Sequence, residues 1–354
     1  MDSRSWYSEP MQTFIVAVTV FYTSVVAIAE PSVAANSCGT ILTHEVASRT
    51  TAMVQSGMWD KAREFLRSRG DVQLAWVPMS IHIVRYTDGS GGIAQSVIEE
   101  AISDLNFHIE STGLVFFQLG ISAYIDSDEM ADFSLEEDAE ALLSLSNPVS
   151  GSVNVWFVPE YEDCGVASFS WSDPQGIVMR NDCTPAGDNH STFSHEVGHY
   201  FDLFHTHETY YGTECVDGSN CSTTGDLICD TEADPDLYFL VDVDCQYTGD
   251  AVDVCGSGVP YNPPTYNLMS YSRKSCRDHF SPEQLSVFAS TAHNTRENHL
   301  RYFDFDGDGE VGSYEIGLIV LNWNTVDVSS DANRDGIVNV FDLLAVLEFW
   351  GDYL

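Results

Sequence analysis

Three histidines along one short helix and its exit constrain this chain more than any other feature. His195 and His199 are four residues apart, so on a helix they lie one turn apart on the same face, as two ligands of one ion require. Glu196 follows the first histidine, where its carboxylate can reach a water without binding the ion. His205 comes six residues after His199, so the chain must turn back to supply a third ligand. The spacing predicts a hydrolytic zinc site with three protein ligands and one open position.

The turn after this helix carries Asp202 at the position where the pattern HExxHxxGxxH has glycine. We expect the turn to need a positive φ, which Asp tolerates better than most residues, at a cost of about 1 kcal/mol. His207 lies two residues beyond His205 and is expected to be a poor substitute ligand. Asp202 should therefore keep the third ligand in register.

The sequence around these residues resembles the metzincin metallopeptidases, and among them the pappalysin-like (cytophagalysin) family, over roughly residues 38–300. The motifs that carry the resemblance are HEVGHYFDLFHTH, YNLMSY, GVASFSW, GIVMRN, GDLICDT and FSPEQ. It implies an α/β (α+β) metzincin fold, in which a twisted mixed sheet and the active-site helix are followed by an irregular, disulfide-rich C-terminal subdomain. It also implies that Met269 forms an apolar floor beneath the zinc and that Tyr271 steadies the tetrahedral intermediate. Asp226 and Thr231 are implied ligands of a structural calcium ion, with simple turn residues as the alternative.

Nine cysteines indicate an oxidising compartment, and eight of them lie between Cys164 and Cys276. Eight cysteines allow about 105 pairings, so spacing alone leaves the connectivity open. The family resemblance implies bridges from Cys221 to Cys255 and from Cys245 to Cys276. The additional cysteines at 215 and 229 leave that mapping open.

The N-terminus predicts a signal peptide over residues 1–29, with cleavage as late as residue 35 as the alternative. Residues 14–29 are apolar and end in Ala-Ile-Ala, a pattern typical of signal cleavage, and the stretch is too short to span a membrane comfortably. A pro-segment is expected over residues 36–76, followed by a catalytic domain over residues 77–302.

Cys38 is the cysteine left over if the other eight pair, and it begins a Cys-Gly-Thr stretch that resembles the start of pro-segments in this family. A thiolate is a strong zinc ligand, so Cys38 could occupy the open position until the pro-segment is cut at the basic cluster of Arg67 and Arg69. A lipid-anchored cysteine and a bridge to another chain are the alternatives.

Strands and helices alternate before the histidine helix, which favours a mixed α/β arrangement. A helical segment is expected over residues 41–69 and a helix over 96–110, and the histidine helix should begin near Ser191. Strands are expected over residues 79–86, 114–119, 153–158 and 176–179. We expect a substrate strand to pair with residues 153–158 as the edge of the sheet.

The last fifty residues repeat internally at an offset of 27 and predict a small all-α module with two calcium loops. Each copy has an EF-hand register with glycine at the sixth position. The expected ligands are Asp304, Asp306, Asp308, Glu310 and Glu315 in the first loop, and Asp331, Asn333, Asp335, Ile337, Asn339 and Asp342 in the second. A loop followed by one helix, twice, resembles dockerin modules, which implies a cohesin-like partner for residues 303–354. A solvated acidic run is the alternative.

The chain has 54 acidic and 14 basic residues and a formal charge of −40, which disfavours a nucleic-acid partner. We therefore predict a secreted, monomeric zinc endopeptidase that acts on proteins, is made as a zymogen and carries a calcium-binding attachment tail. One catalytic zinc ion and two calcium ions in the tail are expected. Whether the catalytic domain binds one or more further calcium ions is left open. Attachment to the cell surface and cleavage specificity are also left open. The competing hypothesis is a calcium-dependent attachment protein with a structural metal.

Overall fold

The computed structural model describes residues 38–40, 44–69, 75–134, 148–185, 189–301, 303–306, 310–327, 329–333 and 336–351. The expected signal peptide and Asp308 and Asp335 lie outside these residues. Within the described ranges, no helix is long and apolar enough to cross a membrane.

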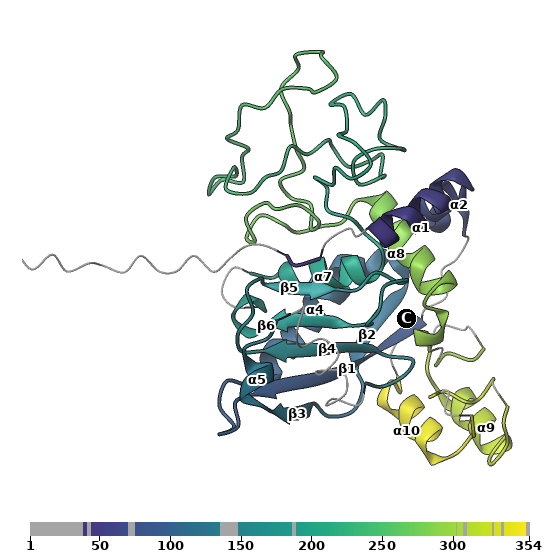
Figure 1. The fold of residues 1–354 in the computed structure, drawn as a ribbon. Coiled ribbons are helices and arrows are strands. Elements are labelled where there is room, and N and C mark those ends of the chain that lie inside the picture. Colours follow the sequence, from purple (N-terminus) through teal and green to yellow (C-terminus); the bar gives the residue numbers. More distant parts are fainter. Residues whose placement is uncertain are drawn as a thin grey trace, which may run out of the picture. The chain divides into compact units, whose positions relative to one another are not determined.

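A mixed sheet with strand order β2-β1-β4-β6-β5 organises the catalytic region (Figure 1). The strands are β1 (Ala75–Arg85), β2 (Leu114–Gln118), β3 (Ala123–Asp126), β4 (Val153–Val158), β5 (Gly165–Ala167) and β6 (Ile177–Arg180). All pairings are parallel except that of β5 with β6, and β3 extends the β1 side. The strands predicted from the sequence are confirmed, while β3 and β5 are additional.

Strand β4 is interior, because it pairs with β1 on one side and β6 on the other. The expectation that residues 153–158 form the edge strand is therefore wrong. All six residues of β4 are buried, as an apolar central strand requires. Of the described strands, the short antiparallel β5 forms one edge of the sheet, and β2 and β3 form the other.

Two helices cover the buried side of the sheet and meet each other there. Helix α4 (Gln95–Ile109) buries Ile98, Ala101, Ile102, Leu105 and Ile109 at helical spacing, and it contacts α7 (Thr192–Tyr200), which carries the zinc motif. Their apolar residues join the strands in one hydrophobic core. Helix α5 (Asp128–Ala131) is a single turn capped by Ser127. The sheet thus provides a rigid floor for the histidine helix.

The predicted helical segment before the catalytic region forms three short helices, α1 (His44–Gln55), α2 (Met58–Arg63) and α3 (Phe65–Ser68). Gly57 adopts a φ of 71° between α1 and α2, which breaks the continuous helix. Helices α2 and α3 pack on α8 (Pro282–Asn294), a helix that begins at a capping box formed by Ser281 and Gln284.

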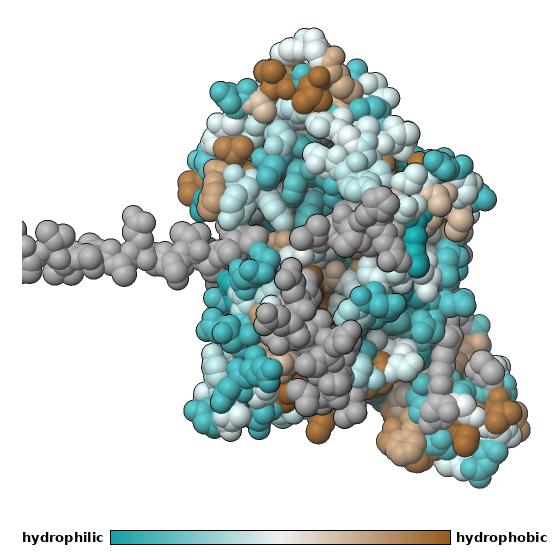
Figure 2. Space-filling view, viewed as in Figure 1, coloured by the Kyte–Doolittle hydropathy of each residue, from teal (hydrophilic) through white to brown (hydrophobic). Residues whose placement is uncertain are grey.

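Residues 206–264 form an irregular subdomain without described helices, visible as long loops in Figure 1. Disulfides hold it: Cys215–Cys255, Cys221–Cys229 and Cys245–Cys276, with Cys164–Cys183 beside the sheet. The expected bridge between Cys245 and Cys276 is confirmed, and the one between Cys221 and Cys255 is wrong. Figure 2 shows a mostly hydrophilic face on which scattered apolar residues lie over this subdomain and the tail.

The tail contains α9 (Ser313–Leu321) and α10 (Val340–Glu348), which pack on each other. Its core is shared with the first strands of the sheet. The Trp76 ring lies 5.1 Å from Phe303 and 5.6 Å from Phe349, and Phe117 lies 5.1 Å from Phe349, measured between ring centroids. Trp76 and Arg301 also exchange two backbone hydrogen bonds of 2.8 Å. The tail is therefore packed as part of the same core as β1 and β2.

We predict that Trp76→Ala destabilises the whole protein by about 3–5 kcal/mol, because it removes a fully buried ring from this shared cluster. Denaturant unfolding should show the loss, and the tail should then separate as an earlier transition. The surface substitution Tyr124→Ala in β3 is the control. A single, unshifted transition in Trp76→Ala would mean that the aromatic cluster contributes little.

Candidate active site

Helix α7 is buried along all nine residues, so the histidines it carries are held inside the protein rather than on its surface. Gly198 allows the helix to approach the loop that carries Met269, because a Cβ at this position would lie 2.6 Å from the Met269 sulfur. The helix ends where Asp202 takes a φ of 70°. This left-handed residue was predicted from the sequence, and it turns the chain so that His205 returns to the helix.

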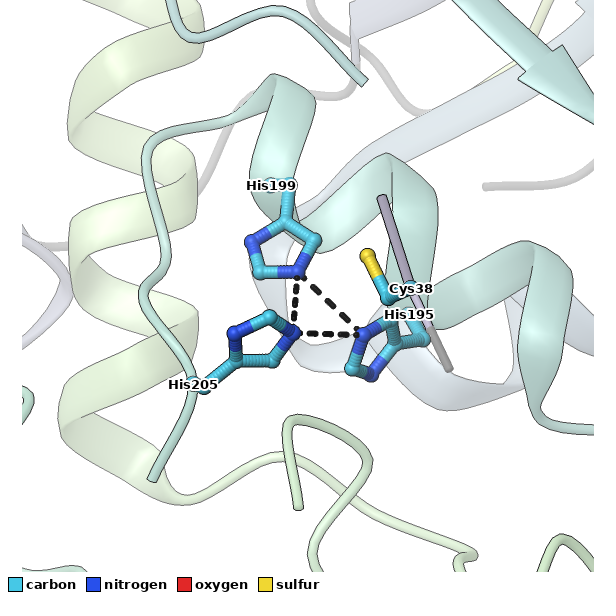
Figure 3. A group of neighbouring side chains, drawn as sticks. All are labelled: Cys38, His195, His199 and His205. Carbon is cyan, nitrogen blue, oxygen red and sulfur yellow. Dashed lines mark hydrogen bonds between the residues drawn. The ribbon is translucent and has the colours of Figure 1, made fainter. Parts of the chain in front are cut away.

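His195, His199 and His205 bring their Nε2 atoms together (Figure 3). The three Nε2–Nε2 distances are 3.2, 3.2 and 3.0 Å. His195 Nδ1 donates to the Leu268 carbonyl at 2.6 Å and His199 Nδ1 donates to the Leu203 carbonyl at 2.7 Å. These bonds place the ring protons on the outer nitrogens, so the Nε2 lone pairs of both rings face inward.

Burial keeps this cluster uncharged. It lowers the pKa of His199 to about 3 and the pKa values of His195 and His205 well below their usual range. Tetrahedral ligands about 2.0–2.1 Å from one zinc ion lie about 3.3 Å apart, close to the distances seen here. Three neutral imidazoles whose Nε2 atoms converge on one point therefore fit a zinc ion.

Glu196 lies on the same helix and is fully buried. Its Oε2 accepts hydrogen bonds from the Cys38 thiol at 3.3 Å and from the Thr40 hydroxyl at 3.5 Å. Oε1 is buried and has no hydrogen-bond partner among the residues that the structure describes. Burial raises the pKa of Glu196 to about 8, the property of a carboxyl group that can both take and return a proton near neutral pH.

Met269 and Tyr271 both lie beside the residues of the histidine cluster. Met269 is fully buried beneath α7, and the side chain of Asn267 accepts a hydrogen bond from its backbone N–H at 2.8 Å. The Tyr271 ring lies 4.7 Å from the His205 ring, and its hydroxyl donates to the Cys38 carbonyl at 3.1 Å. His207 stacks on His205 at 4.9 Å but does not join the three converging nitrogens.

All nine cysteines are described, and Cys38 is the unpaired one. Its Sγ and one nitrogen of each of the three histidines lie within 4.8 Å of one another. Figure 3 shows the Cys38 side chain beside the three rings. Gly39 N donates to the Gly165 carbonyl at 2.8 Å, and the Thr40 hydroxyl accepts from Ala167 N at 2.8 Å. Residues 38–40 thus lie along the free edge of β5, across the histidine cluster.

Arg277 was not predicted from the sequence. Its buried guanidinium donates to the Ser270 carbonyl at 3.1 Å, to the Ser191 hydroxyl at 3.2 Å and to the Thr192 hydroxyl at 3.4 Å. It therefore braces the loop of Met269 against the start of α7. The signal in the sequence was weak: Arg277 stands in a polar stretch close to Arg273 and Lys274, in a chain with only 14 basic residues.

Asp226 and Thr231 are adjacent, since the Thr231 hydroxyl donates to both Asp226 oxygens at 3.2 and 3.1 Å. The Asp226 side chain also accepts from Ile228 N at 3.0 Å, and burial raises its pKa well above the usual range. Nearby Glu214 has a buried oxygen without a partner. These buried carboxyl groups could hold a cation, while their hydrogen bonds also fit a turn.

The tail places Asp304, Asp306 and Glu315 in one carboxylate cluster. Glu315 accepts from Gly312 N at 2.6 Å, and Asp342 accepts from Asn339 N at 2.7 Å, so the twelfth loop residue closes each copy in the same way. Glu310 is exposed in the first loop. In the second, Gly336 N donates to Asp331 at 2.8 Å, Asn333 N donates to Asp342 at 3.1 Å, and the Ile337 carbonyl accepts from the Asn339 side chain at 2.7 Å.

Residues 150–291 match the peptidase M43 family, described as pregnancy-associated plasma protein-A. An extracellular metalloprotease of Colletotrichum graminicola is 26% identical over 279 residues, which cover 74% of this chain and 91% of the relative. Pappalysin-1 of Mus musculus is 28% identical over 176 residues, 46% of this chain and 10% of the relative.

The fold is similar to that of a promirolysin mutant of Tannerella forsythia, with a TM-score of 0.52 and 20% identity over 74% of this chain and 96% of the other. The family match ends before the tail. The fungal relatives are extracellular, and this chain is secreted like them. Together with the HExxH helix and its third histidine, these similarities identify the chain as a metalloprotease whose residues 150–291 resemble the peptidase M43 family.

Proposed function

We propose that the protein is a secreted zinc endopeptidase made as a zymogen. The observation that carries the proposal is the convergence of three neutral histidine nitrogens beside a buried carboxyl group. Zinc held by His195, His199 and His205 would polarise a substrate carbonyl and make water more acidic. A pocket of about 350 Å³ opens here, lined by Cys38, Thr40, His205, His207, Glu208, Thr209, Tyr210 and Tyr271.

The residues of the chain itself supply the proton transfers. Glu196 takes a proton from the attacking water and gives it to the leaving amine. Tyr271, whose hydroxyl lies beside the cluster, donates a hydrogen bond to the negative charge that develops on the carbonyl oxygen. The substrate backbone pairs with the free edge of β5, where Gly165 already accepts a hydrogen bond from residue 39.

The position of Cys38 supports a latent precursor, because its sulfur reaches the histidine cluster, its backbone contacts Tyr271, and the next residue, Gly39, pairs with β5. Similarity in fold to a pro-form of mirolysin supports the same conclusion. A cut at exposed Arg67 or Arg69 would separate Cys38 from the catalytic region.

Trp59 anchors the proposed pro-segment. It is 2% exposed, its ring stacks on Phe204 at 5.7 Å, and its Nε1 donates to the Leu227 carbonyl at 3.0 Å. Arg63 adds a contact of 2.9 Å to Cys229 Sγ and lies 3.7 Å from Glu283. The pro-segment is therefore packed like a core element, which supports a precursor that stays latent until it is processed.

We also propose that the tail binds two calcium ions and that Asp226 and Thr231 contribute to a calcium site in the catalytic domain. The repeated closure of each tail loop by Glu315 and Asp342 supports the first. Exposed apolar residues of α9 and α10, among them Leu321, Phe341 and Leu344, would suit a cohesin-like partner.

The competing function is an attachment protein whose zinc is structural. The observation in its favour is that three histidines and Cys38 together make four protein ligands, the number found in structural zinc sites. Glu196 argues against it, because a structural site has no use for a buried carboxyl group beside its ligands.

We predict that Glu196→Ala in the mature enzyme keeps one zinc per chain and loses peptide cleavage by about 10²-fold or more, because all three ligands remain and the proton-transfer group is gone. Zinc is measured by elemental analysis and cleavage by mass spectrometry of a digested, denatured protein. Glu208→Ala, at the rim of the same pocket, is the control. Turnover near that of the wild type in Glu196→Ala would exclude the mechanism.

We predict that the Cys38→Ala precursor cleaves a peptide before any processing, whereas the wild-type precursor is silent, because the thiol no longer occupies the site. Cys38→Ser is the matched control and should be intermediate, since a hydroxyl is a weaker zinc ligand. If the Cys38→Ala precursor is silent and loses its zinc, the four-ligand structural site is the better explanation.

We predict that the full-length double variant Asp304→Asn/Asp331→Asn binds two calcium ions fewer per chain than the wild type. Calcium titration measures the number of ions bound by each. Each substitution removes a first-position carboxylate from one tail loop. The full chain is used because the tail shares its core with β1 and β2. Asp327→Asn, between the loops, should leave the stoichiometry unchanged. Equal calcium binding by wild type and the double variant would contradict the tail sites.

A further inference from the structure

We infer that Asp202 is a positioning residue that fastens the rim of the substrate cleft to the turn carrying the third histidine. The inference rests on the proposed peptidase function and concerns substrate binding rather than the chemical step. It explains why a buried carboxylate stands where glycine would satisfy the backbone more easily.

Asp202 adopts a φ of 70° and is only 2% exposed. Its Oδ1 accepts from the backbone N–H of Ser170 at 2.8 Å. Its Oδ2 accepts from the Ser170 hydroxyl at 2.8 Å and from the Thr291 hydroxyl at 3.1 Å. One side chain therefore joins the exit of α7, the segment after β5 and helix α8.

Ser170 belongs to the segment that continues β5, and its neighbour Phe169 reaches the metal ligands. The Phe169 ring lies 5.9 Å from the His199 ring and 5.4 Å from the Phe204 ring, both edge-on or tilted. Holding Ser170 in place therefore also holds Phe169 against the histidine cluster.

Arg296 completes the connection and offsets the charge of Asp202. Its buried guanidinium donates to the Tyr200 carbonyl at 2.8 Å, to the Ser168 carbonyl at 3.2 Å and to the Gln175 side chain at 2.8 Å. The same segment after β5 is thus bound from two sides by a carboxylate and a guanidinium. Buried charges of opposite sign stabilise each other, which makes removal of either one costly.

The edge strand needs such support because β5 spans only residues 165–167 and, among the described strands, pairs with β6 alone. The opposite edge of β5 accepts a hydrogen bond from residue 39, so an extended peptide can bind there. If the segment after β5 is loose, part of the binding free energy of a peptide is spent on ordering it. Loss of Asp202 should therefore weaken substrate binding more than it slows turnover.

The test compares mature wild-type enzyme with Asp202→Gly, which keeps the freedom of φ and removes the carboxylate. For peptides long enough to pair with β5, we expect KM to rise about tenfold and kcat to change less than about twofold, as loss of one or two hydrogen bonds predicts. The Ser170 amide should exchange its hydrogen faster, and zinc affinity in a chelator competition should stay within about threefold.

Asp202→Asn should restore most of the KM, because its carbonyl can still accept from Ser170 N and Asn tolerates positive φ. Thr291→Val is the matched control: it removes one bond to Asp202 but keeps both bonds to Ser170, so it should lower the Tm and leave KM unchanged. If Asp202→Gly does not fold, Ser170→Ala tests the same connection and should raise KM by a smaller factor.

The inference is overturned if Asp202→Gly raises the Tm and leaves both KM and Ser170 exchange as in the wild type, since Asp202 would then be only a tolerated turn residue. A zinc affinity that falls in parallel with activity would also overturn it, by placing the effect at the metal ligands. If the wild-type protein has no peptidase activity, the proposed function is wrong. The hydrogen-exchange rate of the Ser170 amide in Asp202→Gly would still show whether Asp202 holds the segment after β5.

Discussion

Two of the three histidine rings, those of His195 and His199, turn their Nε2 atoms to one point because their Nδ1 atoms donate to backbone carbonyls. The carbonyl of Leu203 belongs to the turn after α7, and that of Leu268 belongs to the loop of Met269. The site is therefore set by where two loops place their backbone rather than by the histidines alone. Those loops are held in turn by buried polar groups, Asp202 at the first and Arg277 at the second.

This dependence explains why so many polar groups are buried around one short helix. A buried carboxylate or guanidinium is unfavourable unless its hydrogen bonds are satisfied, and here each such group connects segments distant in the chain. Arg277 connects the start of α7 to the residues after Met269, and Arg296 connects its end to the segment after β5. Burying these charged groups is unfavourable, but their directional hydrogen bonds fix the relative positions of the connected segments. Apolar contacts alone would fix those positions less precisely.

The sequence predicted the parts of the site that are local in the chain. Helical spacing was enough to place His195 and His199, and the six-residue step to His205 identified the turn at Asp202. It could not predict the partners of Asp202, because Ser170 and Thr291 are 32 and 89 residues away. Nor could it reveal β5, whose three residues show no alternating pattern and become a strand only by pairing with β6.

The disulfide error has a similar origin. Cys215 and Cys221 are six residues apart in a segment without regular structure, so spacing did not decide which of them meets Cys255. The choice follows from a local contact, in which Asp253 accepts from Val216 N at 3.0 Å and brings the neighbouring Cys215 to Cys255. Family resemblance was enough for Cys245 and Cys276, which pair as it implied.

The aromatic contact between Trp76 and the tail has a consequence for how such proteins can evolve. A small repeated segment at one end of a chain could in principle be moved by recombination from one gene to another. Here Phe303 and Phe349 lie against Trp76 and Phe117, which come from the first two strands of the sheet. If the tail were attached to an unrelated protein, its aromatic face would be exposed to solvent. The enzyme that lost the tail would in turn expose the aromatic residues of β1 and β2. We therefore expect the tail and the sheet to be inherited together. Substitutions in the residues of one that contact the other should be accompanied by matching substitutions across the contact.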